Sequence, residues 1–322
     1  MFSKYLTEKR KNKGLTQVEF VKALKSYNFS SFGSLDNVTV SRWERGVTCP
    51  SLYKQVLITR FYNDDLLDLL LSQSVEGTFH ELRKIFFERY ESVYSFSNRL
   101  KYSSRQSNHY QVYEFKSMSS KEVKKSINDI ESVHIQFGIP DHDMFQLNFR
   151  NLIEDNRGEF RVYYNSGEKV GHYLAYYFTY DEFCRQTEQS SCTPDYTKTC
   201  NKDCYNKLVL FSSSRFFEVP NLRLYNVYRD VLTLVHNPNI EFFAIRIVTQ
   251  SGYNYYSSRG FSVVTCEGES STGELLIGGK NYRQAIMIIN ANRLLASDYI
   301  VALLKHYHAM NSEARQLDDS FI

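Results

Sequence analysis

The sequence has no run of about 18 apolar residues, so it predicts no membrane-spanning helix and no membrane partner. It also has no secretory signal, because Met1 is followed directly by a charged segment. A cytoplasmic protein is therefore expected. A strong charge imbalance is missing too, since the formal net charge of the 322 residues is +3. What remains is an ordinary globular composition, with 42% hydrophobic and 23% charged residues.

The charge that is present is unevenly distributed along the chain. Residues 1–62 contain 11 Lys and Arg against 4 Asp and Glu, whereas the remainder contains 28 against 32. The basic excess is thus confined to the first fifth of the chain. This favours a compact polyanion-binding module joined to a near-neutral body, although a solvated basic surface would give the same count. A chain of this length is expected to form more than one domain.

The first fifth of the sequence predicts four helices. Thr16 and Glu19 have the spacing of a capping box, Asp36 is placed as an N-cap, and Gly14 and Gly46 as helix stops. On the third helix Val40 and Trp43 are three residues apart and share the buried face. Val18, Phe20, Val21 and Leu24 supply the apolar side of the second helix. The predicted helices span residues 2–13, 16–24, 36–46 and 51–62.

Gly14-Leu-Thr-Gln17 and Thr39-Val-Ser-Arg-Trp-Glu-Arg-Gly46, followed by Pro50-Ser51, resemble the Cro and phage-repressor (Xre) class of helix-turn-helix domain. The resemblance implies double-stranded DNA as a partner and a homodimer as the working form. Arg42 then suits a bidentate contact to guanine, and Lys13 and Arg45 suit the phosphate backbone. Glu44 is expected to pair with a cation. The residues matched to DNA contacts are Gln17, Asn37, Val38, Thr39, Ser41, Arg42, Arg45 and Lys13.

One segment departs from that family. The family joins its second and third helices by a tight turn, whereas residues 25–35 intervene here. A loop of this length is expected either to reach the DNA or to pack against the helices. Residues 64–108 follow as a helical connector, with apolar-periodic segments at 64–71 and from Phe79 onward. We expect part of a dimer contact here or in the C-terminal helix, or else a connector that simply ties two domains together.

From residue 109 the pattern changes to strands mixed with helices. Asn165-Ser-Gly167 separates two strand-like segments and predicts a hairpin. The predicted strands are 110–115, 159–164, 169–180, 207–219, 240–249, 261–266 and 284–290, and the predicted helices are 119–130, 141–154, 222–235, 253–259 and 291–309.

This order resembles the GNAT acyltransferase fold. The residues that carry the likeness are Val170-Gly-His-Tyr173 and Tyr256-Ser-Ser-Arg-Gly-Phe261, while Ser213-Ser-Arg-Phe-Phe217 resembles the acyl-homoserine-lactone and N-acyl amino acid synthases. The resemblance implies an acyl-CoA or acyl-carrier ligand and makes Tyr256 the matching general acid. Packing explains an aromatic residue there equally well. Arg215, Arg223 and Asn226 are the candidate ligand-binding residues.

The phosphate-binding turn of that family is altered. Its two glycine positions are occupied by larger residues in Arg223-Leu-Tyr-Asn226-Val-Tyr228, which would crowd a cofactor's pyrophosphate. Two hypotheses follow. The domain either senses a small molecule or acyl group, or it retains acyl transfer with Tyr256 protonating the leaving thiol. We favour the sensor, because the altered part is the one that would hold the cofactor.

Four of the six cysteines fall within one short polar segment. Their spacing, C-x7-C-x7-C-x3-C, allows a tetrahedral zinc site but lacks the paired C-x2-C form. A thiol–disulfide switch is the second option, since Lys198, Lys202 and Lys207 would favour thiolate. The third is that these cysteines have no joint role. The four candidates are Cys184, Cys192, Cys200 and Cys204.

These observations predict an α+β multidomain protein, with an all-α helix-turn-helix domain and an α/β GNAT-like domain built on a mixed sheet. The predicted function is sequence-specific regulation of transcription with ligand sensing by the second domain. The alternatives are an N-acyltransferase that autoregulates through its DNA-binding domain, and a phage or antitoxin-type repressor whose second domain binds a protein. The predicted boundaries are 1–63, 64–108, 109–292 with the cysteine-rich insertion 184–204, and 293–322.

Overall fold

A computed structural model describes residues 2–75, 79, 81, 84, 110–114, 120–136, 154–165, 168–188, 191–217, 220–269 and 275–319. The chain divides into two compact units. The first comprises residues 1–78, 231–238 and 292–322, and the second comprises 79–230 and 239–291. Among the described residues, no helix combines the length and the apolar character needed to cross a bilayer.

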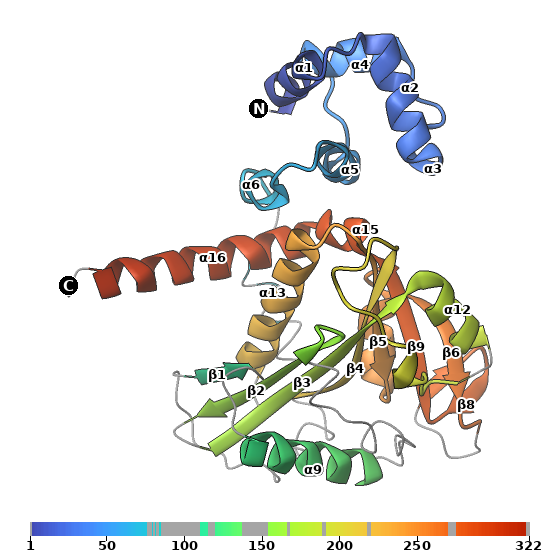
Figure 1. The fold of residues 1–322 in the computed structure, drawn as a ribbon, viewed down its shortest axis with the longest axis vertical. Helices are drawn as coiled ribbons and strands as arrows, with labels where there is room; N and C mark the ends of the chain where they lie inside the picture. The colour runs from blue at the N-terminus through green and yellow to red at the C-terminus, as the bar shows by residue number, and fades with distance from the viewer. Residues whose placement is uncertain are drawn as a thin grey trace. The chain divides into compact units, whose positions relative to one another are not determined.

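The N-terminal part of the first unit is all helical (Figure 1). The Thr16 hydroxyl accepts a hydrogen bond from the Glu19 N–H and the Glu19 carboxylate accepts one from the Thr16 N–H, so the predicted capping box is confirmed. Asp36 caps its helix by accepting from the Thr39 N–H at 2.7 Å. The predicted helices are confirmed with these bounds: α1 Phe2–Asn12, α2 Gln17–Tyr27, α4 Asn37–Glu44, α5 Leu52–Tyr62 and α6 Leu66–Leu71.

Two expectations about these helices need correction. The segment 25–35 is not a long loop, because α2 continues to Tyr27 and a short helix, α3, follows at Phe29–Phe32. Phe32 and Leu35 are buried in the helical core, so burial of apolar side chains fixes the segment. Val18 does not belong to the apolar side of α2, since it is 50% exposed.

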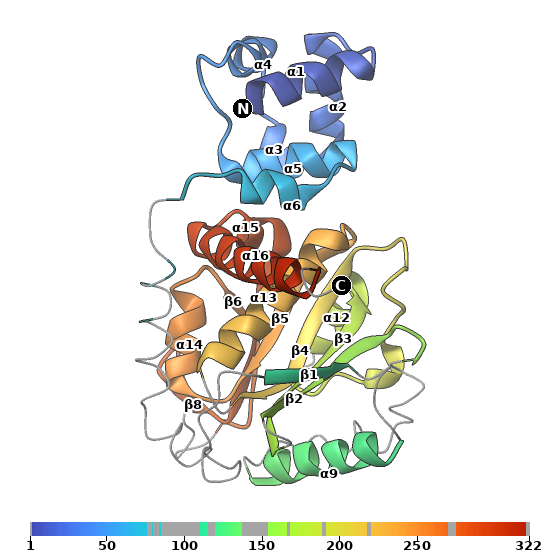
Figure 2. The same cartoon turned by 90° about the vertical axis from the view of Figure 1, so that its left-hand side faces the viewer.

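The second unit is built on a seven-stranded mixed sheet with the order β1-β2-β3-β4-β5-β9-β6 (Figure 2). Its neighbouring strands are antiparallel except for the parallel pair β4–β5. β2 and β3 pair across the predicted hairpin. The strands are β1 Tyr110–Glu114, β2 Gly158–Asn165, β3 Glu168–Thr179, β4 Leu208–Phe217, β5 Ile240–Ile247, β6 Ser262–Glu267 and β9 Gln284–Asn290. A separate hairpin joins β7 Leu275–Ile277 to β8 Lys280–Tyr282.

Alternation along the strands gives the sheet two different faces. On one face Val162, Tyr176 and Phe211 join an apolar core with Val123 of α9 (Ser120–Gln136) and Phe183 of α12 (Tyr180–Glu188). The opposite face carries the charged residues of β2 and is covered by α13 (Pro220–His236), whose side chains hydrogen-bond to them. The polar chemistry of this unit is therefore concentrated on the α13 face.

The remaining elements refine the predicted boundaries. α14 spans Gln250–Ser257, and the single helix predicted over 291–309 is two helices, α15 Ala291–Leu295 and α16 Asp298–Asp319. The helix α12, the 3₁₀ turn η2 at Tyr196–Lys198 and the β7–β8 hairpin were absent from the sequence prediction. The helix predicted over 141–154 falls outside the described residues apart from Glu154, as does most of the one predicted from Phe79 onward.

Candidate functional site

Helix α4 has one buried and one exposed face. Val40 is fully buried and Trp43 is 5% exposed, and both pack in the helical core, as predicted. On the other side Asn37 and Arg42 are exposed and Val38 is 60% exposed. No hydrogen bond or ion pair joins the Arg42 side chain to any residue that the structure describes. The helix thus presents a polar surface with a free guanidinium group.

Glu44, at the end of α4, ties three helices together. Its carboxylate accepts hydrogen bonds from Arg10 Nε at 2.5 Å and Nη2 at 3.0 Å, which confirms that it pairs with a cation. Gln17 Nε2 of α2 donates to the same carboxylate at 2.7 Å. Burial alone would raise the pKa of Glu44, but the hydrogen bonds from Arg10 and Gln17 bring it below its usual value. Sequence reasoning missed Arg10, because nothing distinguishes it within a run of basic residues.

The other residues predicted to touch DNA all lie on the described helices or beside them. Thr39 and Ser41 are half-buried on α4. Arg45 is exposed, and its Nε donates to the Ser41 carbonyl at 3.3 Å. The Lys13 ammonium lies 4.8 Å from the centre of the Phe61 ring, so it is held beside the end of α5. Their contact with DNA stays a prediction.

In the second unit, the parallel strands β4 and β5 part before they end. Their pairing begins at Leu208 and Ile240 and stops at Ser212 and Ile245, although β4 continues to Phe217. A bulge at Ser213 falls at this point, since Leu174 and Ala175 of β3 face Ser214 and Ser212. Beyond it, main-chain pairing between these two strands is replaced by side-chain contacts.

Arg215, Arg223 and Tyr256 meet close to where the strands part. Arg215 Nη2 donates to the Arg246 carbonyl of β5 at 3.3 Å, and its guanidinium lies 5.2 Å from the centre of the Tyr256 ring. Arg223 Nη2 donates to the Tyr256 hydroxyl at 2.8 Å. Arginine has donors only, so the tyrosine oxygen accepts in this hydrogen bond. Tyr256 is 8% exposed and also packs against Phe261.

Asn226, the third predicted ligand residue, belongs to a different group on the same face. Its Oδ1 accepts from Arg161 Nη1 at 3.0 Å and from the Tyr163 hydroxyl at 2.7 Å, and its Nδ2 donates to Asp230 Oδ2 at 3.1 Å. Arg161 also pairs with Asp230 at 3.0 Å and with Glu159. This buried polar network is the largest group of ionisable residues that sequence reasoning missed. Charged residues inside a strand, at Glu159 and Arg161, were the available signal.

The electrostatics of this network follow from its burial. Burial raises the pKa of Asp230 to about 6, although the Arg161 guanidinium opposes the shift. Burial likewise disfavours the charged form of Arg161, but Glu159 and Asp230 hold its pKa above the usual value. Two carboxylates and one guanidinium therefore share a dry site, and Arg161 keeps its charge.

The segment taken as an altered phosphate-binding turn is not a turn. Arg223–Tyr228 lies inside α13, which begins three residues earlier at Pro220. Leu224, Asn226 and Tyr228 are each at most 4% exposed. Beyond the first turn of a helix the backbone N–H groups bond within the helix, so residues 224–228 do not form a phosphate cradle.

The four cysteines of this segment differ in burial, from half-buried to fully buried. All four cysteines are free, and no group of three His, Cys, Asp or Glu within the described residues could hold a metal ion. Cys192 is fully buried, and burial raises its pKa to about 12. Burial and the neighbouring Cys204 raise the pKa of Cys200 to about 11. Desolvation outweighs the Arg246 guanidinium at Cys192 and the Arg157 guanidinium at Cys200, so both thiols favour the protonated form, and a joint role of the four cysteines stays a prediction.

Solved structures similar to this chain include acyltransferases. They include an N-acyl amino acid synthase, FeeM, from uncultured soil microbes (11% identity, TM-score 0.37, 62% of this chain and 98% of that chain). An N-acetyltransferase from Staphylococcus aureus Mu50 covers 57% of this chain and 98% of its own at 10% identity and TM-score 0.32. Spermidine N-acetyltransferase from Vibrio cholerae, solved with CoA and spermine, covers 59% of this chain and 99% of its own, at 11% sequence identity and a TM-score of 0.35. Values this low transfer no activity, ligand or partner to this chain.

No protein-family model matches the sequence, and a search of curated proteins also gave no match.

Proposed function

We propose that the protein is a sequence-specific regulator that reads double-stranded DNA with α4. The supporting observation is the division of this helix into an apolar face packed in the core and a polar face left to solvent. A helix of this kind fits the major groove, where side chains meet the base edges. The resemblance of its sequence to phage repressors agrees with this role. Two copies of the chain would read the two half-sites of an operator.

Each exposed side chain has a matching contact. The Arg42 guanidinium can bind guanine O6 and N7 in a bidentate manner, and the Asn37 amide can bind adenine N6 and N7. Arg45 and Lys13 would hold phosphates, which fixes position without reading sequence. Gln17 is already bonded to Glu44. We expect it to stiffen the base of α4 and to contact DNA only through the remaining amide atoms.

The test begins with selection of bound duplexes from a random pool by the full-length protein, followed by mobility-shift titration of the selected site. Arg42→Ala should weaken binding to that site roughly tenfold to a hundredfold, because one bidentate pair contributes about 1–3 kcal/mol. Lys4→Ala removes a positive charge from an exposed position of α1 and serves as the matched control. Absence of any selected sequence, or an unchanged Arg42→Ala affinity, would contradict the proposal.

A second function is favoured by one specific arrangement in the other unit. The Tyr256 hydroxyl accepts a hydrogen bond from Arg223, and the guanidinium of Arg215, which bonds across the point where β4 and β5 part, lies 5.2 Å from the centre of the Tyr256 ring. We propose that this region binds an acyl group carried by CoA or a carrier protein. In acyl transfer the neutral amine attacks the thioester carbon, a carbon–nitrogen bond forms and the carbon–sulfur bond breaks. Tyr256 gives its proton to the departing thiolate, and the proton lost by the nitrogen restores the Tyr256 hydroxyl. A sensor would bind the same group without this step.

Titration with acyl-CoA and with acyl-carrier protein separates these two roles. A sensor would change its operator affinity on binding and release no free thiol. An enzyme would release thiol in the presence of an amine acceptor, and Tyr256→Phe would lower the rate about a hundredfold, the usual contribution of a general acid. Failure of the protein to bind either acyl carrier would overturn both.

A further inference from the structure

Three buried polar residues follow one stripe of α13. Arg223, Asn226 and Asp230 are spaced by three and four residues, and each is at most 9% exposed. This spacing places them on one side of the helix, the side that meets the sheet. Arg223 donates to the Tyr256 hydroxyl at 2.8 Å. The Arg161 guanidinium of β2 donates to Asn226 and to Asp230, in each case at 3.0 Å. The helix thus joins the Arg223–Tyr256 contact to the buried network around Arg161.

A row of side chains on the sheet makes the same connection. Arg161 of β2, Tyr173 of β3 and Arg215 of β4 are successive partners in the strand register, so their side chains lie on one face. The Arg161 guanidinium lies 4.6 Å from the centre of the Tyr173 ring. Arg215, at the other end of the row, lies 5.2 Å from the centre of the Tyr256 ring. The network therefore reaches the surroundings of Tyr256 both along α13 and across the strands.

Both carboxylate oxygens of Asp230 face hydrogen-bond donors. Arg161 Nη1 donates to Oδ1 at 3.0 Å, and Asn226 Nδ2 donates to Oδ2 at 3.1 Å. The orientation of the Asn226 amide follows from Arg161, which has donors only and therefore faces the amide oxygen. A proton on either oxygen of Asp230 would compete with one of these donors. Ionised Asp230 thus holds α13 to β2 by two contacts, and protonation weakens one of them.

Burial and charge act on Asp230 in opposite directions. It is 6% exposed, and burial raises its pKa to about 6 although the Arg161 guanidinium opposes the shift. Burial also raises the pKa of the three neighbouring tyrosines, so they stay neutral in mild acid. The charged and titratable groups around Asp230 in the described structure are Glu159, Arg161 and Tyr163 of β2, Tyr173 and Tyr177 of β3, and Arg229 of α13.

We propose that Asp230 is a positioning residue for the Arg223–Tyr256 contact, which weakens when Asp230 is protonated. Asp230 acts through Asn226 and Arg161, which fix the middle turns of α13 on β2. The proposal rests on the acyl-binding function proposed above for the region around Tyr256, and it makes that function sensitive to mild acid.

The test observes Tyr256 itself, by ¹⁹F NMR of the full-length protein with 3-fluorotyrosine at position 256. Between about pH 5 and pH 7.5 the resonance should shift with a midpoint near pH 6. Asp230→Asn should abolish this midpoint. Asn226→Ala removes a donor that stabilises the ionised carboxylate, so it should move the midpoint to higher pH.

A resonance that does not shift in this range, or a midpoint that persists in Asp230→Asn, would overturn the proposal. Circular dichroism shows whether each variant folds. If Asp230→Asn does not fold, the direction in which Asn226→Ala moves the midpoint decides, and a lower or unchanged midpoint overturns the proposal.

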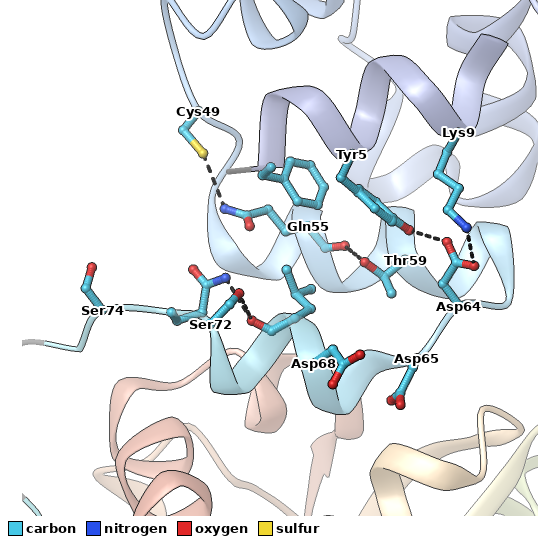
Figure 3. A pocket seen from close by; sticks show the side chains of 13 residues that line it. Tyr5, Lys9, Cys49, Gln55, Thr59, Asp64, Asp65, Asp68, Ser72 and Ser74 are labelled. Atoms are coloured by element: carbon cyan, nitrogen blue, oxygen red, sulfur yellow. Dashed lines mark hydrogen bonds and ion pairs between the residues drawn. The ribbon is translucent and has the colours of Figure 1, made fainter. Parts of the chain in front are cut away.

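Asp64 of the first unit provides the matched control. Its carboxylate likewise pairs with a cation, since Lys9 Nζ lies 2.7 Å from Oδ1, and the Tyr5 hydroxyl donates to Oδ2 at 2.7 Å (Figure 3). Asp64→Asn should leave the midpoint at Tyr256 unchanged. An equal loss of the midpoint in Asp64→Asn would show a general effect of removing a paired carboxylate and would overturn the role of Asp230.

Titration of the same proteins with acyl-CoA separates this proposal from the acyl-binding function. The unsubstituted protein should bind acyl-CoA up to about tenfold more weakly at pH 5.5 than at pH 7.5, the effect of one weakened hydrogen bond. Asp230→Asn should remove this difference, although any titration of the carrier itself is retained. Expected ¹⁹F midpoints without acyl-CoA binding would overturn the acyl-binding function and support the coupling of Asp230 to Tyr256. Acyl-CoA binding without a ¹⁹F response would overturn the coupling alone.

Discussion

Two arginines of the N-terminal segment, Arg10 and Arg42, have different roles in the fold. Arg10 and Arg42 belong to the same basic excess, yet the Arg10 side chain is 11% exposed in an ion pair, whereas Arg42 is exposed and forms no ion pair with any described residue. The sequence counts them alike. Only the position of Glu44 in the folded core selects Arg10 as its partner and leaves Arg42 for the solvent face. The residue that we expect to read DNA is thus the one that the fold does not use.

The different burial of the cysteines predicts which of them reacts with an alkylating agent. At pH 8 the buried Cys192 thiol stays protonated, because its pKa is about 12. Only about one molecule in ten thousand then carries the reactive thiolate. We expect iodoacetamide to alkylate the exposed Cys49 in the native protein and to leave Cys192 unmodified, as measured by peptide mass spectrometry.

In urea both residues should react, which controls for peptide recovery. If Cys192 is labelled in the native protein as fast as Cys49, the Cys192 thiol is not buried.

At the scale of elements, local sequence signals determine where helices start, whereas tertiary contacts determine how the helices pack against one another. The capping residues Thr16 and Asp36 act within three residues of themselves, so the sequence alone specifies the starts of α2 and α4. The angle at which the two helices meet depends on α3, whose Phe32 is buried among residues far along the chain. Sequence periodicity carries no information about such an angle.

Asp36→Ala tests the cap of α4. The substitution removes the acceptor for the Thr39 N–H and should lower the free energy of unfolding by about 1 kcal/mol. Urea denaturation followed by circular dichroism measures the change. Thr48→Ala, at an exposed position just after the helix, should change the unfolding free energy by less than about 0.5 kcal/mol. If the two substitutions change the unfolding free energy equally, Asp36 does not stabilise α4 as its N-cap.

At the scale of the whole molecule, one contact joins segments that are far apart in the sequence. The Arg60 guanidinium of α5 donates to the carbonyls of Val235 at 2.8 Å and Leu234 at 2.6 Å, near the end of α13. These residues all belong to the first unit. Burial lowers the pKa of Arg60 to about 10, so the group is still charged at neutral pH. Its two bonds satisfy carbonyls that a helix end would otherwise leave open.

Arg60→Met should therefore destabilise the protein. Methionine keeps much of the side-chain volume but leaves two buried carbonyls unsatisfied, which costs about 2 kcal/mol in unfolding free energy. Chemical denaturation gives the measurement, with the exposed Arg45→Met as the matched control. Arg60→Lys should recover only part of the loss, because an ammonium does not reproduce the fork of a guanidinium. Full stability of Arg60→Met would show that the contact contributes nothing.

The sequence by itself determined the helix starts and stops, the alternation of the strands, the buried face of α4 and the concentration of positive charge, because each depends on neighbours within a few residues. Tertiary contacts decided the partner of Glu44, the parting of β4 from β5, the meeting of Arg223 with Tyr256 and the burial of Cys192. These depend on distances between residues tens to hundreds of positions apart, which local pattern does not encode. Cys192 is the clearest instance, since both the burial that raises its pKa and the Arg246 guanidinium that opposes the shift come from residues brought together only by the fold.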